Sequence, residues 1–360
     1  MNAPLHFSAR PRVDLDGAAA DELVRDLMRL DVRADTGGLR RLRLELAALG
    51  PRAGADNEAL LWLDGQRLRL GSELRIAAGP VETGRVIFEG RVSRIEAQFS
   101  QGELPVAVCE AEDALWPLRM TRRFKTWKQM GLSDIAQQLA SEHGLSAQVD
   151  ADSPTWDVVQ QWNETDLALL RQLAARVGAE LWIEGTTLHL ATRAQRGGAP
   201  LTLVQGNELI ALAIDCDLAA QRSEVLASGY DAQAEQAISE TASSGELGGL
   251  AAGGTSGPQA LEAAFKTFKT QRPLDVPMKG AEAAARAKAE LKRRAQRFVR
   301  ARGLTTGSAD MDVGSPLRLE RVGALFEGEG YVVSELHHQF DMQHGFRTAF
   351  VAERGSISNT

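Results

Sequence analysis

The sequence predicts an α+β protein that is mainly β, with two similar antiparallel β-barrel domains and inserted α+β and helical units. Three observations predict this class: apolar and polar residues alternate on both sides of residues 113–198, helical periodicity is confined to residues 113–198 and 281–301, and one stretch of sequence recurs. The 360 residues exceed a single core and predict two or three domains. A hydrophobic content of 44% with 25% charged residues is that of a folded globular chain.

Residues 1–112 predict the first β-barrel. Leu42, Leu44 and Leu46 alternate with charged residues, and the same period of two runs through Val86 to Ile95. One face of each strand is therefore expected to be buried and the other wet. Glycines separate these runs at hairpin-like intervals, which favours an antiparallel barrel or sandwich.

Residues 113–198 predict a peripheral α+β domain. A first helix carries Ile135 and Leu139 on one face and ends at Gly144, a typical C-terminal glycine. A second helix is expected to begin at Asn163 and to end at Gly178, with apolar residues at helical spacing between them. A hairpin around residues 184–186 follows.

The second barrel is predicted to be split into residues 199–230 and 302–360. Between these segments lies an insertion, residues 231–301. The stretch Ser243–Gly257 predicts a flexible low-complexity linker, and residues 281–301 predict an amphipathic helix. The apolar face of this helix is expected to hold Ala284, Ala287, Leu291, Ala295 and Phe298.

A repeat relates the two predicted barrels. Its three matches occur in the same order: 71–76 with 314–319, 88–90 with 326–328, and 93–99 with 334–340. The distance from the first glycine to the serine of the last match is 22 residues in one copy and 20 in the other. Repeats indicate a function performed by symmetry. Three copies of such a chain would display six barrels and could sit flush against a six-fold partner.

Charge and cysteine content exclude several classes of protein. A formal net charge of -7 argues against a dedicated nucleic-acid binder, which needs a basic footprint. Two cysteines, Cys109 and Cys216, are too few for a disulfide scaffold, which indicates folding in a reducing cytoplasm. Charged residues interrupt the first thirty positions, so we expect no signal peptide, and no window predicts a membrane span.

Basic residues gather in the predicted helix. Residues 279–302 contain nine basic and two acidic residues, a formal charge of +7, so the rest of the chain carries -14. This asymmetry favours an acidic protein partner, although a solvated helix face is the plainer interpretation. Trp127 and Trp156 are expected to be core residues, with an interface anchor as the alternative. The candidate interface residues are Lys288, Lys292, Arg293, Arg297, Arg300, Trp127 and Trp156.

The polar residues predict no catalytic, cofactor-binding or metal site. His337, His338 and His344 form the one histidine cluster, but neighbours on a strand point to opposite faces. Glu89 and Glu327 lie in predicted Phe-Glu-Gly turns, where a solvated acid needs no special role. Nucleophile elbows, phosphate loops and dinucleotide fingerprints are absent from the sequence. We therefore expect no enzymatic activity.

Several stretches together resemble a known family, the late control protein D type of phage tail hub, which is related to the hub part of the valine-glycine repeat proteins of type VI secretion. The resemblance is carried by residues 123–127 (RFKTW), 133–136 (SDIA), 143–145 (HGL), 161–167 (QWNETDL) and 314–354. Each motif is weak alone, but their order and spacing cover nearly the whole chain.

The resemblance implies a homotrimeric baseplate hub at the tip of a contractile phage tail or tail-like injection machine. Its two tube-type barrels per chain would form a pseudo-hexameric ring between a six-fold inner tube protein and a three-fold spike. Because the sequence stops soon after the second barrel, the spike is expected to be a separate trimeric protein. Tape measure and baseplate wedge proteins are further implied partners, and nucleic acid is expected only as transiting cargo.

The implied location is the baseplate of a particle assembled from a chain made in the bacterial cytoplasm. Two alternatives stay open: a tail-associated peptidoglycan hydrolase, and a docking module for cargo or tape measure protein that would use the Ser243–Gly257 loop. The sequence does not separate a phage from a domesticated injection system or a type VI secretion system.

Overall fold

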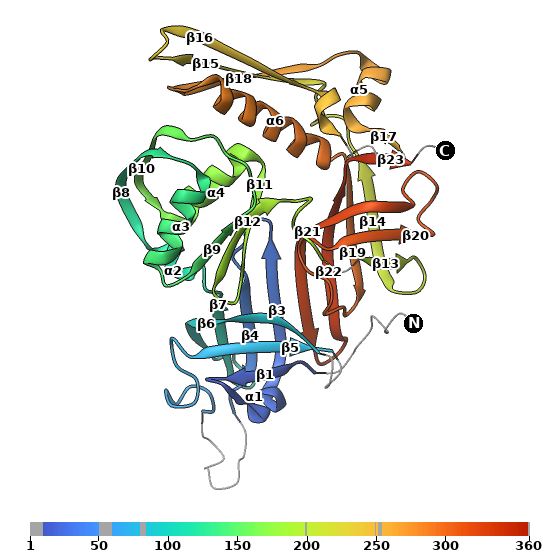
Figure 1. Ribbon diagram of the computed structural model, residues 1–360. Coiled ribbons are helices and arrows are strands. Elements are labelled where there is room, and N and C mark those ends of the chain that lie inside the picture. Colours follow the sequence, from blue (N-terminus) through green and yellow to red (C-terminus); the bar gives the residue numbers. More distant parts are fainter. Residues whose placement is uncertain are drawn as a thin grey trace.

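Antiparallel sheet dominates the computed structural model, which describes residues 10–49, 60–79, 84–198, 200–248, 250 and 254–358 (Figure 1). Its largest sheet has 13 strands, and smaller sheets of two or three strands surround it. Four separate clusters of buried apolar side chains lie under these sheets and their helices. The protein is therefore α+β and mainly β, as the sequence predicts.

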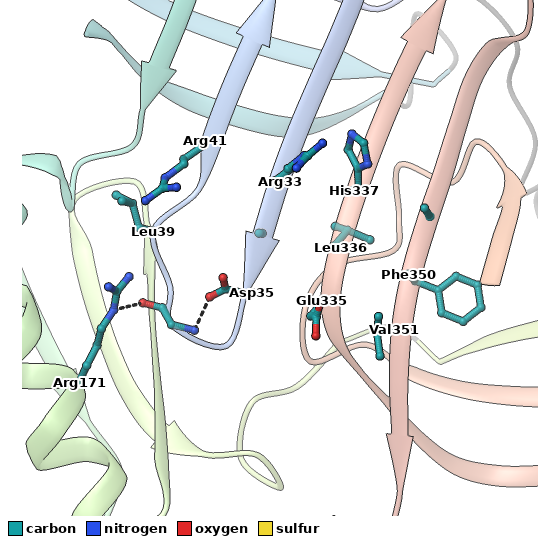
Figure 2. A pocket seen from close by; sticks show the side chains of 13 residues that line it. Arg33, Asp35, Leu39, Arg41, Arg171, Glu335, Leu336, His337, Phe350 and Val351 are labelled. Atoms are coloured by element: carbon teal, nitrogen blue, oxygen red, sulfur yellow. Dashed lines mark hydrogen bonds between the residues drawn. The ribbon is translucent and has the colours of Figure 1, made fainter. Parts of the chain in front are cut away.

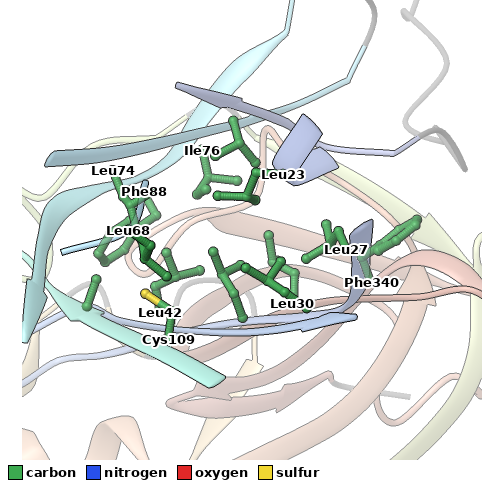
Figure 3. Close-up of a cluster of buried hydrophobic side chains, with 14 of the residues drawn as sticks. Leu23, Leu27, Leu30, Leu42, Leu68, Leu74, Ile76, Phe88, Cys109 and Phe340 are labelled. Carbon is green, nitrogen blue, oxygen red and sulfur yellow. The ribbon is translucent and has the colours of Figure 1, made fainter. Parts of the chain in front are cut away.

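An N-terminal repeat forms one half of the large sheet. It consists of β3 (Leu27–Asp35), β4 (Arg41–Ala47), β5 (Glu73–Ala78), β6 (Arg85–Gln98) and β7 (Val106–Glu112). The alternating leucines of β4, together with Leu27 and Leu30 of β3, belong to the cluster of buried side chains shown in Figure 3, which also holds Cys109 and Phe88. The short elements β1 (Arg12–Leu15), β2 (Ala18–Ala19) and α1 (Asp21–Asp26) extend this half beyond β5.

A C-terminal repeat forms the other half. Its strands are β14 (Leu209–Cys216), β19 (Val299–Thr306), β20 (Pro316–Glu320), β21 (Gly328–Asp341) and β22 (Gly345–Arg354), and the short β13 (Leu201–Val204) pairs with β20. Tyr331 and Phe350 are buried in its core. Phe340 and Phe346 instead pack into the core of the N-terminal repeat, so the two halves share side chains as well as backbone pairing.

The two repeats have the same strand order. The N-terminal repeat runs β3-β4-β7-β6-β5, and the C-terminal repeat runs β14-β19-β22-β21 with β20 beside β21. The two halves join where β21 pairs antiparallel with β3. Among the described strands the pairing forms an open path, so the structure shows two equivalent sheet halves where the sequence predicts barrels.

The correspondence extends to single residues. A β-bulge lies at Ser93, between the β6–β7 pairs of Val92 and Arg94, and an equivalent bulge lies at Ser334, between the pairs of Val333 and Glu335. In both copies the serine hydroxyl donates to a backbone carbonyl of the neighbouring strand, at 3.4 Å and 3.3 Å. Such bulges re-aim a strand and are specific features of a fold. The predicted repeat is therefore a structural repeat.

The predicted α+β unit packs beside the large sheet. It contains α2 (Trp116–Met120), β8 (Arg122–Met130), α3 (Leu132–Glu142), β9 (Ser146–Val149), β10 (Trp156–Thr165), α4 (Asp166–Val177), β11 (Ala179–Glu184) and β12 (Thr187–Thr192). β8 and β10 form a two-stranded sheet, and β9, β11 and β12 form another. The second helix begins at Asp166 rather than Asn163, because Thr165 is the N-cap: its hydroxyl accepts a hydrogen bond from the Ala168 amide in the first turn.

The insertion has more structure than the sequence predicts. β15 (Glu224–Asp231), β16 (Gln236–Ser243) and β18 (Lys269–Pro277) form a sheet that α6 (Gly280–Gln296) covers. The segment up to residue 230, predicted to belong to the second barrel, therefore belongs in part to the insertion. The alternation of apolar and polar residues in this segment predicted a strand correctly, but it could not identify which strands that strand pairs with.

The predicted linker and helix also need correction. The predicted linker Ser243–Gly257 includes a 3-10 helix, η1 (Ser244–Leu247), and the strand β17 (Gly254–Ser256), which pairs with β23 (Ser356–Ser358). The last residue of β17, Ser256, is the N-cap of α5 (Gly257–Phe265). Residues 249 and 251–253 lie outside the described residues. Helix α6 ends at Gln296, because the chain enters β19 at Val299. Phe298 is buried but lies after the helix, and Ala284 is exposed while Ala283 is buried.

Candidate assembly surfaces

The junction of the two repeats carries an open cavity of about 660 Å³ (Figure 2). Arg33 and Arg41 line it from the N-terminal repeat, Glu335 and His337 from β21, and Arg171 from α4. The Arg171 Nε–H donates to the carbonyl oxygen of Gly37 at 2.7 Å, which fixes the β3–β4 turn against α4. Three parts of the chain thus meet at this cavity.

A buried carboxylate links the repeats beside the cavity. Asp31 on β3 accepts hydrogen bonds from Arg29 at 2.7 Å and meets His337 Nε2 of β21 at 2.6 Å. Burial alone would raise the pKa of Asp31, but the hydrogen bonds from His337 and Arg29 outweigh it and lower that pKa to about 2. Asp31 therefore stays ionised and stabilises the β3–β21 junction.

An ionic network joins the same three parts on another side. Arg40 donates to both carboxylate oxygens of Asp312 at 2.7 Å, which connects the two repeats directly. Arg193, from the α+β unit, pairs with Glu353 of β22 at 2.7 Å and with Glu180 at 2.7 Å. The two Arg193 pairs are largely withdrawn from solvent, so they fix the relative positions of the units more strongly than surface pairs would. The Asp312 side chain is 49% exposed, so its pair with Arg40 contributes less.

A second buried carboxylate organises the α+β unit. Asp166, fully buried at the start of α4, accepts two bonds from Arg123 Nε and Nη2 at 2.8 and 2.9 Å. His143 lies 2.8 Å and the Gln161 amide 2.9 Å from the same carboxylate. These bonds outweigh burial and lower the pKa of Asp166. Asp166 therefore holds a negative charge at the start of α4 and also belongs to a network that holds the β8–β10 sheet on the helices.

Three of the predicted basic interface residues form pairs within the chain. Arg293 binds Glu290 at 2.6 Å, Arg297 binds Glu353 at 3.2 Å, and Arg300, which lies on β19 rather than on the helix, binds Glu335 at 3.3 Å. Lys288 is exposed on α6, and Lys292 lines a cavity between α4 and α6. Part of the +7 charge is therefore compensated inside the protein.

The two predicted tryptophans are core residues. Trp127 and Trp156 are each 2% exposed and pack with α3 and α4 in the core of the α+β unit, which excludes them as exposed interface anchors. The opposite face of the β8–β10 sheet instead exposes Phe124 (79%) and Trp162 (72%), which are cross-strand partners. Alternation along residues 122–130 places Phe124 opposite to Trp127 and could have identified this exposed face.

The histidines and glutamates lie in unrelated places. His338 is buried and bonds the Thr348 hydroxyl at 2.9 Å, and burial lowers its pKa to about 3, whereas His344 meets Asp341 at 3.1 Å on the surface. Glu89 is exposed within β6 rather than in the predicted turn, and Glu327 is exposed just before β21.

In the part of the chain that the structure describes, none of the helices combines the length and the apolarity that crossing a membrane requires.

Solved structures with a similar fold are two tail proteins, one of them from a prophage, and a component of a secretion system. A 43 kDa tail protein of prophage MuSo2 from Shewanella oneidensis has a TM-score of 0.69 and 14% identity, with 96% of this chain and 98% of that chain covered. A tail protein from Neisseria meningitidis has a TM-score of 0.66 and 13% identity, with 97% of each chain covered. An Escherichia coli component of the type VI secretion system follows with a TM-score of 0.58, 12% identity, and coverage of 91% and 73%.

These likenesses show the fold. A search of the curated proteins found no match. Residues 57–341 match the family model described as the Alg8 N-terminal domain, and the chain therefore belongs to the family that this model defines. The description of this family states no activity. The family differs from the late control protein D type that the sequence resembles.

Proposed function

We propose that this chain, which shares its fold with phage tail proteins, is a structural baseplate hub of the late control protein D type. It would act as a homotrimer in a contractile phage tail or a tail-like injection system. The observation that carries the proposal is the structural repeat, in which two sheet halves with the same strand order and the same bulge join edge to edge. A trimer then presents six equivalent halves to a six-fold tube while keeping three-fold symmetry for a spike.

The domain organisation that we propose follows the sequence with one adjustment. The N-terminal repeat occupies residues 1–112 and the peripheral α+β domain residues 113–198, while the C-terminal repeat combines the chain around β13 and β14 with the chain from β19 to residue 360. The insertion begins before β15 and includes α6. Each of these parts has a cluster of buried side chains, which supports treating them as separate units.

A purely structural role without catalysis agrees with the arrangement of the polar residues. The most elaborate buried polar groups, Asp31, Asp166 and Glu353, are engaged in bonds that hold elements together. The partners we propose are two further copies of the chain, an inner tube protein, a separate trimeric spike, and tape measure and wedge proteins of the baseplate. The chain would be made in the bacterial cytoplasm and assembled into the particle.

Particle analysis in the native host tests this proposal. The chain, carrying an affinity tag, should copurify with tail particles at three copies per particle, and labelling of the tag should mark the end of the tail that carries the baseplate. Deletion of its gene should leave no complete baseplates. Complete particles formed without the chain, or a label distributed along the tail, would show that the chain is not the hub.

A further inference from the structure

The junction inside the chain uses one edge of β21. Along residues 328–332 this edge pairs with β20, and along 335–341 the same edge pairs with β3, while β22 occupies the opposite edge. The partners across the β3 junction include Leu336 with Ala34 and Phe340 with Leu30. Phe340 is 3% exposed there, and Leu30 is fully buried.

The strands equivalent to this pair lie at the two ends of the repeated sheet. β6 corresponds to β21, and its first half pairs with β5 as β21 pairs with β20. Among the described strands, however, residues 94–98 of β6 pair with β7 alone, and β14, the equivalent of β3, pairs with β19 alone. Each repeat therefore has one unpaired strand edge, on β6 in the N-terminal repeat and on β14 in the C-terminal repeat. The equivalent edges, on β21 and β3, pair with each other at the internal junction.

The register of the two edges can be carried over from the internal junction. The shared bulge makes Ser93 equivalent to Ser334, so Ile95, Ala97 and Phe99 correspond to Leu336, His338 and Phe340. The strand partners agree. They connect Ile95–Cys109–Leu44–Leu30 in one repeat and Leu336–Phe350–Gly303–Leu212 in the other. Leu212 and Ile214 of β14 are therefore the equivalents of Leu30 and Val32 of β3.

We infer that residues 94–100 of one copy pair antiparallel with β14 of a second copy of this chain, in the register of the internal β21–β3 junction. This inference rests on the proposed function and specifies the contact that builds the trimer. It places Phe99 opposite Leu212, Ala97 opposite Ile214 and Gln98 opposite Ala213.

The exposed side chains at both edges support the pairing. Phe99 is 64% exposed, although its equivalent Phe340 is buried. On β14, Leu212 and Ile214 are only partly buried, whereas their equivalents on the paired strand β3 are fully buried. Unpaired strand edges with apolar side chains are sites of further strand pairing. The same register places Arg94 opposite Asp217, which are oppositely charged. Covering these edges would bury the side chains just as the internal junction does.

This contact joins two different edges and is therefore head-to-tail. A head-to-tail contact closes into a ring when the rotation between copies allows it. Because the internal and external junctions would have the same register, they would alternate around the ring with similar rotations. Three copies would then give six junctions of one kind, and the large sheets would form a continuous belt.

A pair of cysteines tests the register. In a Cys216→Ala background, Gln98→Cys is combined with Ala213→Cys, and the protein is oxidised and run on a non-reducing gel. Directly opposite residues on antiparallel strands have Cα atoms about 4.5–5.5 Å apart, within the range that a disulfide spans. Cys109 does not compete, because burial raises its thiol pKa to about 12. We expect a disulfide between chains and a ladder that stops at a covalent trimer.

The control shifts one cysteine by two residues on the same face. Gln98→Cys with Ala211→Cys places the sulfur atoms diagonally, and we expect at least about tenfold slower crosslinking. Light scattering of the unmodified chain shows whether the chain forms a trimer, which separates the test of the trimeric hub from the test of the strand register. A trimer without the Gln98–Ala213 crosslink, or with equal crosslinking of the control, would overturn the proposed register and leave the hub intact. A chain that stays monomeric and uncrosslinked at every concentration would contradict both.

Discussion

Replacing the buried carboxylate of Asp166 should loosen the α+β unit specifically. Asp166→Asn keeps the shape of the side chain but leaves Arg123 and His143 without their buried anion. Removing one partner of a buried ion pair costs about 3–5 kcal/mol. Arg123 retains Glu142 at 2.7 Å on the solvent side, so we expect the lower end, about 3 kcal/mol.

Hydrogen exchange followed by mass spectrometry measures this loss locally. A loss of about 3 kcal/mol corresponds to roughly 100-fold faster exchange of the most protected amides in α3, α4 and the β8–β10 sheet. The amides of β21 and β22 should be unchanged. Glu142→Gln is the matched control, because it removes a partner of the same arginine at the surface, where a pair contributes less than about 1 kcal/mol. Equal effects of the two substitutions would refute the reasoning.

Three further predictions test other parts of the structure. Gly38→Ala should lower the free energy of unfolding in urea by about 2–4 kcal/mol, because φ at Gly38 is +88° and a Cβ there would lie 2.3 Å from the Leu181 carbonyl oxygen of β11. Gly17→Ala is the control: φ is +82° but the space around it is open, so the loss should be only about 1 kcal/mol. The lowered pKa of Asp31 stabilises the fold at pH values above 3.8, the ordinary pKa of an aspartate, and this contribution is lost as the pH falls toward about 2. The melting temperature of Asp31→Asn should therefore depend less on pH between 4 and 2 than that of the unmodified chain. Parallel curves for the two proteins would contradict the lowered pKa of Asp31. Trp127→Ala should cost about 3–5 kcal/mol and Trp162→Ala less than about 0.5 kcal/mol, and similar losses in denaturant titrations would show that the exposed and buried faces of β8–β10 are misassigned.

Local patterns in the sequence predicted local structure well. The alternation of Leu42, Leu44 and Leu46 gave β4, and the apolar spacing before Gly178 gave α4. The repeat predicted more, because the similar spacing of glycine and serine in the two copies reflects equivalent hydrogen bonds. The Gly71 amide donates to the Val92 carbonyl oxygen, and the Gly314 amide donates to that of Val333, each at 2.8 Å. A repeated sequence therefore carried information about strand order that alternation alone does not carry.

Other features depend on contacts between distant residues and could not be predicted. Alternation in residues 224–231 is the same whether the strand joins the large sheet or the β16-β15-β18 sheet. Charge counting identified α6 as basic, but it could not show that Arg297 and Arg300 reach Glu353 and Glu335, which are distant in sequence. The interface that we propose therefore lies at the unpaired strand edges, which become visible only when the pairing of every described strand is known, and the basic helix as an interface stays a prediction.

The mass of the purified chain in solution tests the central claim most directly. Light scattering over a range of protein concentrations should show a particle of three times 38.9 kDa. The account predicts a closed trimer whose mass does not increase further as concentration rises. A mass that stays at one chain, or one that grows without limit as in an open filament, would contradict a trimeric hub.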